Sequence, residues 1–143
     1  MTSADPRLTL YPQLDRIAAF LAARGAQDIR HGGRTLFDHL VGTASCLIVA
    51  RAAEDVVYAG LCHSVYGTPF FSHKLLGAED RRQLQSLLGE RAEELVWSYS
   101  TFVAGKVEAG RDLCSLEPLM QIAIANQMDI FDAAAAASQG TYS

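Results

Sequence analysis

Apolar residues recur along most of the chain at spacings of three and four, and strict alternation of apolar and polar residues is almost absent. This spacing matches the 3.6 residues per turn of an α-helix and argues against strands. Glycines separate the periodic stretches, as they commonly do just past the end of a helix. The pattern predicts an all-α protein, a compact single-domain bundle of about six helices.

The first two predicted helices cover residues 12–24 and about 35–51. Apolar residues fill much of the circumference of the second helix, so we expect it to be central. A third helix, capped or opened by Asp55, contains the almost wholly apolar string VVYAGLCHSVY at residues 56–66. This string is too short for a membrane span and is expected to form the floor of any pocket.

Glycine, proline and aromatic residues gather at residues 67–77, which predicts an irregular loop able to fold over a cavity. Two helices with solvated charged faces are expected within residues 78–102. A loop or frayed link with two glycines follows at 103–115. The last predicted helix covers 116–137 and has Pro118 in its first turn, where proline is favoured.

A single domain is expected over residues 1–143, with its periodic core at about 12–132 and with mobile ends, including the C-terminal tail SQGTYS. No apolar run approaches the roughly 18 to 20 residues of a membrane span. The N-terminal string MTSADPRLTL also lacks the basic and then apolar order of a signal peptide. These features predict a cytoplasmic protein that does not associate with membranes.

The net charge and the cysteines limit which partners and metal ions the protein is expected to bind. The formal net charge is −4 and no basic stripe is present, so we do not expect nucleic-acid binding. Cys46, Cys62 and Cys114 are an odd number of cysteines, widely spaced, which is unlike a disulfide framework or paired zinc ligands. They are expected to be free thiols in a reducing compartment.

Three of the four histidines fall within HGGRTLFDHLVGTASCL, residues 31–47, and GLCHSVYGT, residues 60–68. Imidazole is the side chain most often used for both metal ligation and proton transfer near neutral pH. His39 and His63 lie on apolar predicted helices and are expected to point inward from neighbouring faces. A single such residue is most simply a core histidine bonded to a carbonyl, but two on adjacent buried helices favour a functional site.

The strings DHLVGTASCL, AGLCHSVYG and IAIANQMDIFD, in this order, resemble the HD-domain superfamily of helical metal-dependent enzymes. The resemblance covers about residues 12–132 and implies that His39 matches the first family histidine and His63 that of the His-Asp pair. Ser64 stands in place of the aspartate of the pair, and Asn126 in place of a late aspartate. More specifically, the strings HGGRTLFDHLVGT and GLCHSVYGT resemble a small branch of HD-like proteins in which His-Ser is itself the pattern.

The family site binds a divalent metal through two histidines and two aspartates, whose anionic oxygens offset the charge of the ion. Neutral serine and asparagine do not, so we do not expect a standard HD phosphohydrolase. One hypothesis is a rebuilt site in which His31, His39 and His63 hold one divalent metal ion and leave a position for water. Asp129 is a candidate for an additional carboxylate contact, whereas Asp38 is expected on the surface or as a helix cap.

The leading hypothesis is a small-molecule-processing enzyme that uses histidine-centred acid and base chemistry, with or without that metal. His63 is the expected central group. Ser64 is not expected to be a nucleophile, because the sequence shows no strand-to-helix elbow. The expected catalytic residues are His63, His39, His31 and, as a donor to an oxyanion, Tyr66; the expected substrate-binding residues are Arg34, Ser64, Thr68 and Asn126.

Two other hypotheses stay open. The protein is alternatively a non-catalytic binder of a small ligand, with Phe70 and Phe71 covering an apolar cage and His73 exposed. It is otherwise an interaction module, for which an exposed apolar patch on the helix of Trp97 would be the sign. The substrate, the reaction and the oligomeric state are not fixed by the sequence.

Overall fold

Six α-helices dominate the computed structural model, which describes residues 10–106 and 110–140, and the all-α prediction is confirmed. Two short strands, β1 (Arg30–His31) and β2 (Arg34–Thr35), pair as an antiparallel hairpin. No helix among the described residues is both long and apolar enough to cross a membrane. The helices are α2 (Leu14–Ala23), α3 (Leu36–Val49), α4 (Glu54–Leu61), α5 (Arg81–Leu88), α6 (Glu90–Tyr99) and α7 (Pro118–Gly140), and the short 3-10 turns are η1 (Ala26–Asp28), η2 (Ala78–Asp80) and η3 (Leu113–Ser115).

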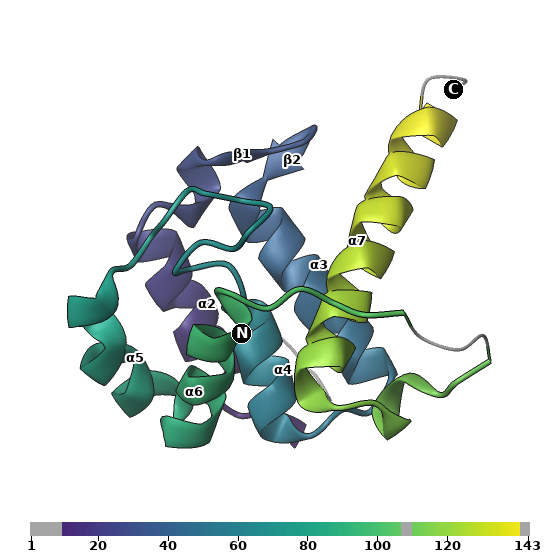
Figure 1. The fold of residues 1–143 in the computed structure, drawn as a ribbon. Helices are drawn as coiled ribbons and strands as arrows, with labels where there is room; N and C mark the ends of the chain where they lie inside the picture. The colour runs from purple at the N-terminus through teal and green to yellow at the C-terminus, as the bar shows by residue number, and fades with distance from the viewer. Residues whose placement is uncertain (1–9, 107–109, 141–143) are drawn as a thin grey trace.

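Helix α3 is central, as its apolar circumference predicts. It packs along α7 on one side and against α4 on another, and Figure 1 shows α3 and α7 running side by side. Leu40 and Leu47 of α3 are fully buried, together with Val57 of α4 and Ile122 of α7. These contacts fix the relative positions of the three elements that carry the site described below.

A capping box starts α3. The Thr35 hydroxyl accepts a hydrogen bond from the backbone N–H of Asp38 at 3.1 Å, and the carboxylate of Asp38 accepts one from the N–H of Thr35 at 3.4 Å. These bonds satisfy two backbone donors that the first turn would otherwise leave unpaired. Asp38 is therefore a capping residue, as the sequence predicts, and takes no part in a site.

Helix α4 ends at Leu61, five residues before the predicted end at Tyr66. The imidazole of His63 accompanies this early end, because its Nδ1 atom lies 2.7 Å from the carbonyl oxygen of Gly60, an acceptor in the last helical turn. The chain continues in turns up to Gly67, whose positive φ of 82° favours glycine. His63 therefore lies in a turn just past the helix.

Glu93 corrects the prediction that the charged faces of α5 and α6 are solvated. Its side chain is fully buried and accepts hydrogen bonds from the Tyr66 hydroxyl at 2.9 Å, from Arg81 at 2.8 and 3.0 Å, and from Gln85 at 3.2 Å. The Arg81 guanidinium lies over the ring of Trp97, 4.3 Å from its centroid. The buried carboxylate of Glu93 is thus hydrogen-bonded through both oxygens, and its partner Arg81 stacks on Trp97.

The other predictions from the sequence concern the 67–77 segment, the cysteines and the two ends of the chain. Residues 67–77 form an irregular loop, hereafter the 67–77 loop, with a single bridge between Thr68 and Phe71. All three cysteines are free. Residues 1–9 of the predicted mobile N-terminal segment and residues 141–143 of the predicted mobile tail lie outside the described residues. Tyr11 is buried and its hydroxyl donates to the carbonyl oxygen of Ala52 at 2.9 Å, and residues 138–140 continue α7. The strong helix propensity of the preceding alanines accounts for this extension.

Candidate functional site

His39 and His63 approach one point from different elements, as the sequence predicts. The Nε2 atom of His39, on α3, lies 2.7 Å from Oδ1 of Asn126 on α7, and Nε2 of His63 lies 3.1 Å from the same oxygen. The two rings are nearly perpendicular, with centroids 5.1 Å apart, and both are almost completely buried. Three residues from distant parts of the sequence therefore meet in one polar cluster.

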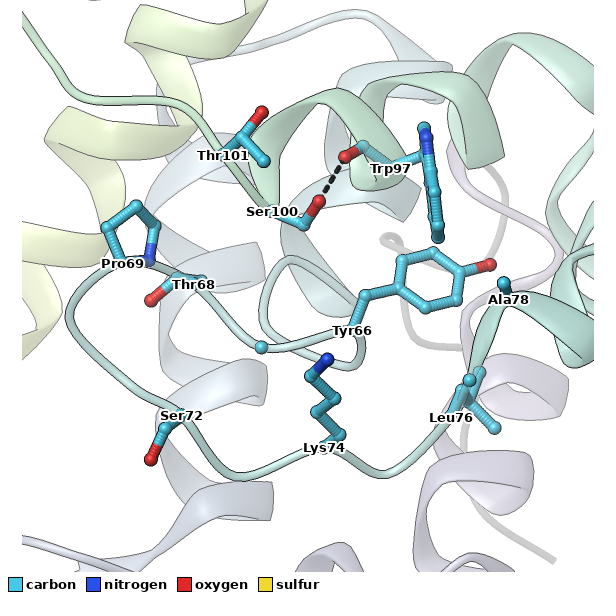
Figure 2. A pocket seen from close by; sticks show the side chains of 12 residues that line it. Tyr66, Thr68, Pro69, Ser72, Lys74, Leu76, Ala78, Trp97, Ser100 and Thr101 are labelled. Carbon is cyan, nitrogen blue, oxygen red and sulfur yellow. Dashed lines mark hydrogen bonds between the residues drawn. The ribbon is translucent and has the colours of Figure 1, made fainter.

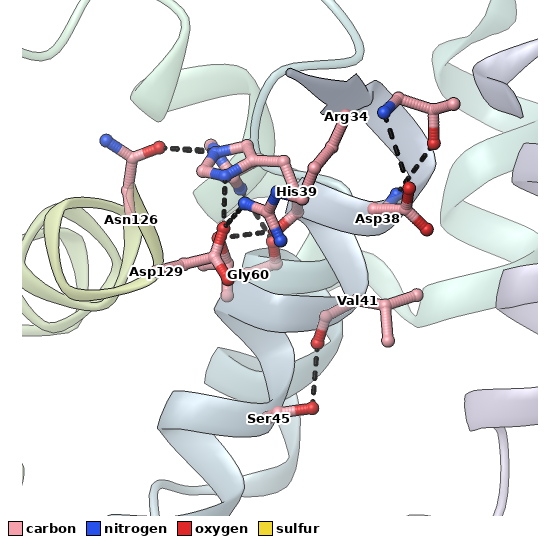
Figure 3. Close-up of polar contacts among 11 residues, drawn as sticks. Arg34, Asp38, His39, Val41, Ser45, Gly60, Asn126 and Asp129 are labelled. Atoms are coloured by element: carbon pink, nitrogen blue, oxygen red, sulfur yellow. Dashed lines mark hydrogen bonds and ion pairs between the residues drawn. The ribbon is translucent and has the colours of Figure 1, made fainter. Parts of the chain in front are cut away.

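Asp129 orients His39 from the other side of its ring (Figure 3). It follows Asn126 by three residues, which places both side chains on one face of α7. Its Oδ2 atom accepts hydrogen bonds from Nδ1 of His39 at 2.6 Å and from the guanidinium of Arg34 at 2.5 Å. The carboxylate of Asp129 accepts from Nδ1, so Nε2 is the ring nitrogen that carries the lone pair in the tautomer that this contact favours.

Arg34 therefore has a different role from the predicted one. The sequence predicts that Arg34 binds a carboxylate, phosphate or enolate oxygen of the substrate, but the anion that it contacts is Asp129 of the same chain. The short β-hairpin holds Arg34 beside the start of α3, from which its side chain reaches α7. Pairing with Arg34 offsets the cost of burying the carboxylate of Asp129.

His63 is a neutral imidazole at neutral pH. Burial, reinforced by the nearby His39, lowers its pKa from 6.5 to about 4. Its Nδ1 atom donates to the Gly60 carbonyl, so its Nε2 atom is also an acceptor. An amide oxygen cannot donate to these Nε2 atoms, but an amide NH₂ group has two hydrogens to donate. A rotation of the Asn126 amide by 180° would direct its NH₂ group toward both rings.

His31 joins the cluster by stacking. Its ring lies parallel to that of His39, with centroids 4.0 Å apart and an angle of 8° between the planes, and it also contacts the ring of Phe71. Partial burial, together with the neighbouring His39 and Arg34, lowers the pKa of His31. His31 thus covers one face of His39.

A cavity of about 410 Å³, hereafter the histidine cavity, opens beside these rings. Ser64 lines it, and its buried hydroxyl has no hydrogen-bond partner among the described residues. Phe70, which is 82% exposed, and Phe71 border it from the 67–77 loop, as predicted for a cover. The lining residues are His31, His39, His63, Ser64, Thr68, Phe70, Phe71, Tyr99, Phe102, Ala104, Ala123, Asn126, Gln127 and Ile130.

The comparisons with known proteins identify a family. A protein-family model described as a domain of unknown function, DUF6817, matches residues 20–103. The chain belongs to this family. No curated protein and no solved structure matches it. The matched segment of the DUF6817 chain includes both buried histidines and the 67–77 loop, whereas Asn126 and Asp129 lie beyond it on α7.

Tyr66 is the predicted catalytic residue that the structure places elsewhere. Its hydroxyl points away from the histidine cavity and donates to Glu93, and burial together with that bond raises the pKa of Tyr66. It lines a second cavity of about 570 Å³, beside Trp97 and Lys74 (Figure 2). The early end of α4 accounts for this, because Tyr66 follows the turn and leaves the helix face.

The donor atoms do not fit the predicted three-imidazole metal site. A metal ion binds in the plane of an imidazole ring, so the parallel rings of His31 and His39 cannot direct their lone pairs to one ion. Within the described parts of the DUF6817 chain, no three or more histidine, cysteine, aspartate or glutamate side chains are grouped to hold a metal ion. The two remaining imidazoles share only the neutral amide of Asn126.

Sequence reasoning gave Asp129 only a secondary role and missed the rest of the α7 wall. Ala123, Gln127 and Ile130 line the histidine cavity with Asn126, and their spacing of three and four residues marks one helix face. That spacing was visible in the sequence as the signal of a wall. The positions of Tyr99 and Phe102, on and after α6, depend on tertiary packing.

Proposed function

We propose that this DUF6817 chain is an enzyme that processes a small molecule by histidine-centred acid and base chemistry in the histidine cavity. The observation that carries the proposal is the hydrogen-bonded series Asp129, His39 and Asn126, of which His39 and Asn126 line the cavity. Asp129 holds the Nδ1 proton, so Nε2 of His39 is the atom that accepts a proton from a substrate or water. The same carboxylate stabilises the imidazolium that forms.

His39 replaces His63 as the central group in this proposal. A general base works best when its pKa lies near the working pH, and burial holds the pKa of His63 at about 4. His63 instead accepts a hydrogen bond through Nε2 while the Gly60 carbonyl fixes its ring. Asn126 and the unpaired hydroxyl of Ser64 orient substrate or water beside it.

We also infer an HD-like origin for the site. The residues that the resemblance matches to family ligands, His39, His63 and Asn126, meet within hydrogen-bonding distance, and Ser64 lines the same cavity. This convergence supports the resemblance. With no carboxylate at the two substituted positions, the proposed reaction differs from that of a standard HD phosphohydrolase.

The test incubates the wild type and its variants with a small-molecule extract of cells. Mass spectrometry then measures which compounds each protein depletes. The wild type is expected to deplete at least one compound, and His39→Gln and Asp129→Asn are expected not to. His73→Gln, at an exposed histidine outside the cavity, is the matched control and should act like the wild type. Equal depletion by His39→Gln would contradict the proposal.

The second candidate is a non-catalytic binder of a small ligand. It is favoured by the bond from His63 to a backbone carbonyl and by the aromatic walls of the cavity. An extract left unchanged by the wild type, while one of its components raises the melting temperature, would support this candidate. For either function we propose a cytoplasmic protein with a small-molecule partner, in keeping with the three free cysteines and the net charge of −4.

A further inference from the structure

The described lining of the histidine cavity is made of aromatic, apolar and uncharged polar residues together with three histidines. None of its described lining residues is lysine, arginine, aspartate or glutamate. Aromatic rings make up much of the wall: Phe71 lies against His31 and Tyr99 against His63, each with ring centroids 5.4 Å apart. The polar atoms meet where the histidines approach Asn126.

The charged pair behind His39 also offers no free charge to a ligand. Arg34 and Asp129 bind each other behind His39, and neither lines the cavity. Burial also lowers the pKa values of His31 and His63, which favours the uncharged form of both rings. An anion that entered would lose its hydration without meeting a lysine or arginine side chain in the described lining, which is unfavourable.

We propose that the ligand of the histidine cavity is an uncharged, flat and largely apolar molecule with one hydrogen-bonding head group, such as an amide, a ketone or an alcohol. The head group binds among His39, Asn126 and the unpaired hydroxyl of Ser64, and the apolar part lies between the aromatic rings. Carboxylates and phosphate esters are disfavoured. The inference rests on the proposed function for the choice of cavity and adds the class of ligand.

Four probes with one aromatic body separate the effect of charge: benzamide, benzoate, phenyl phosphate and benzylammonium. Binding is followed by NMR of the isoleucine methyl groups, since Ile130 lines the cavity and the fully buried Ile17 does not. Benzamide is expected to shift the Ile130 signal and to bind at least about tenfold more tightly than the three charged probes. A charged probe that binds as tightly, or benzamide without an effect on Ile130, would overturn the proposal.

A charge added to the wall provides the converse test. Gln127 is exposed at the cavity and Gln27 is exposed away from it, so Gln127→Lys and Gln27→Lys form a matched pair. Gln127→Lys is expected to strengthen benzoate binding by about tenfold, whereas Gln27→Lys is expected to change nothing. Equal benzoate affinity in the two folded variants would overturn the proposal.

The two proposals fail in different ways. Tight benzamide binding combined with an unchanged cell extract would reject the enzymatic function and support the charge preference. Depletion of an anionic compound that requires His39 would support the enzymatic function and overturn the charge preference.

Discussion

The carboxylate of Asp129 lies directly against the backbone of α3 at Gly42, where a Cβ atom would overlap Oδ1 of Asp129. Gly42→Ala is therefore expected to push Asp129 away from His39 and to lower the free energy of unfolding by about 1–3 kcal/mol. Urea denaturation measures this loss. Gly33→Ala is the matched control, because a Cβ there meets open space, and its effect is expected to stay within about 0.5 kcal/mol.

Combining Gly42→Ala with Asp129→Ala tests whether the overlap is the cause. Removal of the carboxylate makes room for the new methyl group, so the cost of Gly42→Ala should become much smaller in the Asp129→Ala background. The same cost in both backgrounds would show that the alanine acts elsewhere.

The bond between Asp129 and His39 predicts one tautomer of His39. In protein with ¹⁵N-labelled histidine, NMR should find the His39 proton on Nδ1, and Asp129→Asn should lower the rate of any reaction on the order of 10²- to 10⁴-fold. A proton on Nε2 of His39 in the wild type would contradict the assignment of that atom as the base.

The buried imidazole of His63 predicts a loss of stability in mild acid. The unfolded chain gains a proton at this ring below pH 6.5, but the folded chain gains it only near pH 4, so the free energy of unfolding falls as pH decreases between these values. The loss from this ring is up to about 3 kcal/mol. Urea denaturation between pH 7 and 5 should therefore show a flatter pH dependence for His63→Gln than for the wild type.

His73→Gln is the control for this pH dependence, because His73 is exposed on the 67–77 loop. The free energy of unfolding of His73→Gln should change with pH as steeply as that of the wild type. The lowered pKa of His31 adds to the slope with the same sign, so His63→Gln should reduce the slope without abolishing it. Identical slopes for wild type and His63→Gln would exclude a neutral buried ring.

Glu93→Gln tests the network beneath Trp97. Burial opposes ionisation of Glu93, but its hydrogen bonds from Arg81, Tyr66 and Gln85 outweigh burial and lower its pKa. The substitution removes the charge that holds Arg81 and is expected to lower the free energy of unfolding by about 1–3 kcal/mol. The fluorescence of Trp97 should change as well, because Arg81 lies over its ring. Glu94 is the exposed neighbour of Glu93, so Glu94→Gln is the control. It should change neither the free energy of unfolding nor the fluorescence of Trp97.

Metal content tests the donor geometry. Protein purified without a metal-binding tag is expected to contain well under one equivalent of zinc, iron or manganese by plasma mass spectrometry, because its two converging imidazoles share no carboxylate ligand. Near-stoichiometric metal that disappears in both His39→Ala and His63→Ala would reverse this expectation and assign a metal site to these rings.

The helical pattern was readable from the sequence because it depends on local spacing. The central position of α3, the cap at Asp38 and the irregular 67–77 loop were all correctly predicted. The convergence of His39 and His63 was expected from their positions on apolar faces. These features follow from periodicity and from local backbone chemistry.

The errors involve contacts between residues that are distant in the sequence. Tyr66 was assigned to the wrong cavity, because the bond from His63 to Gly60 accompanies an earlier end of α4. Glu93 looked like part of a solvated face until its partners across α5 and α6 were known. The pairing of Arg34 with Asp129 joins residues 95 positions apart, a contact that no local pattern signals.

The site is completed late during synthesis of the chain, because two of its groups lie on α7. Both imidazoles precede it in the chain, while the amide of Asn126 and the carboxylate of Asp129 belong to it. Since a chain is made from its N-terminus, the buried face of α3 stays uncovered until α7 has been translated. A nascent chain that ends after α6 thus holds both rings but lacks the two groups that contact the ring of His39, and the polar cluster is complete only after residue 129 has been added.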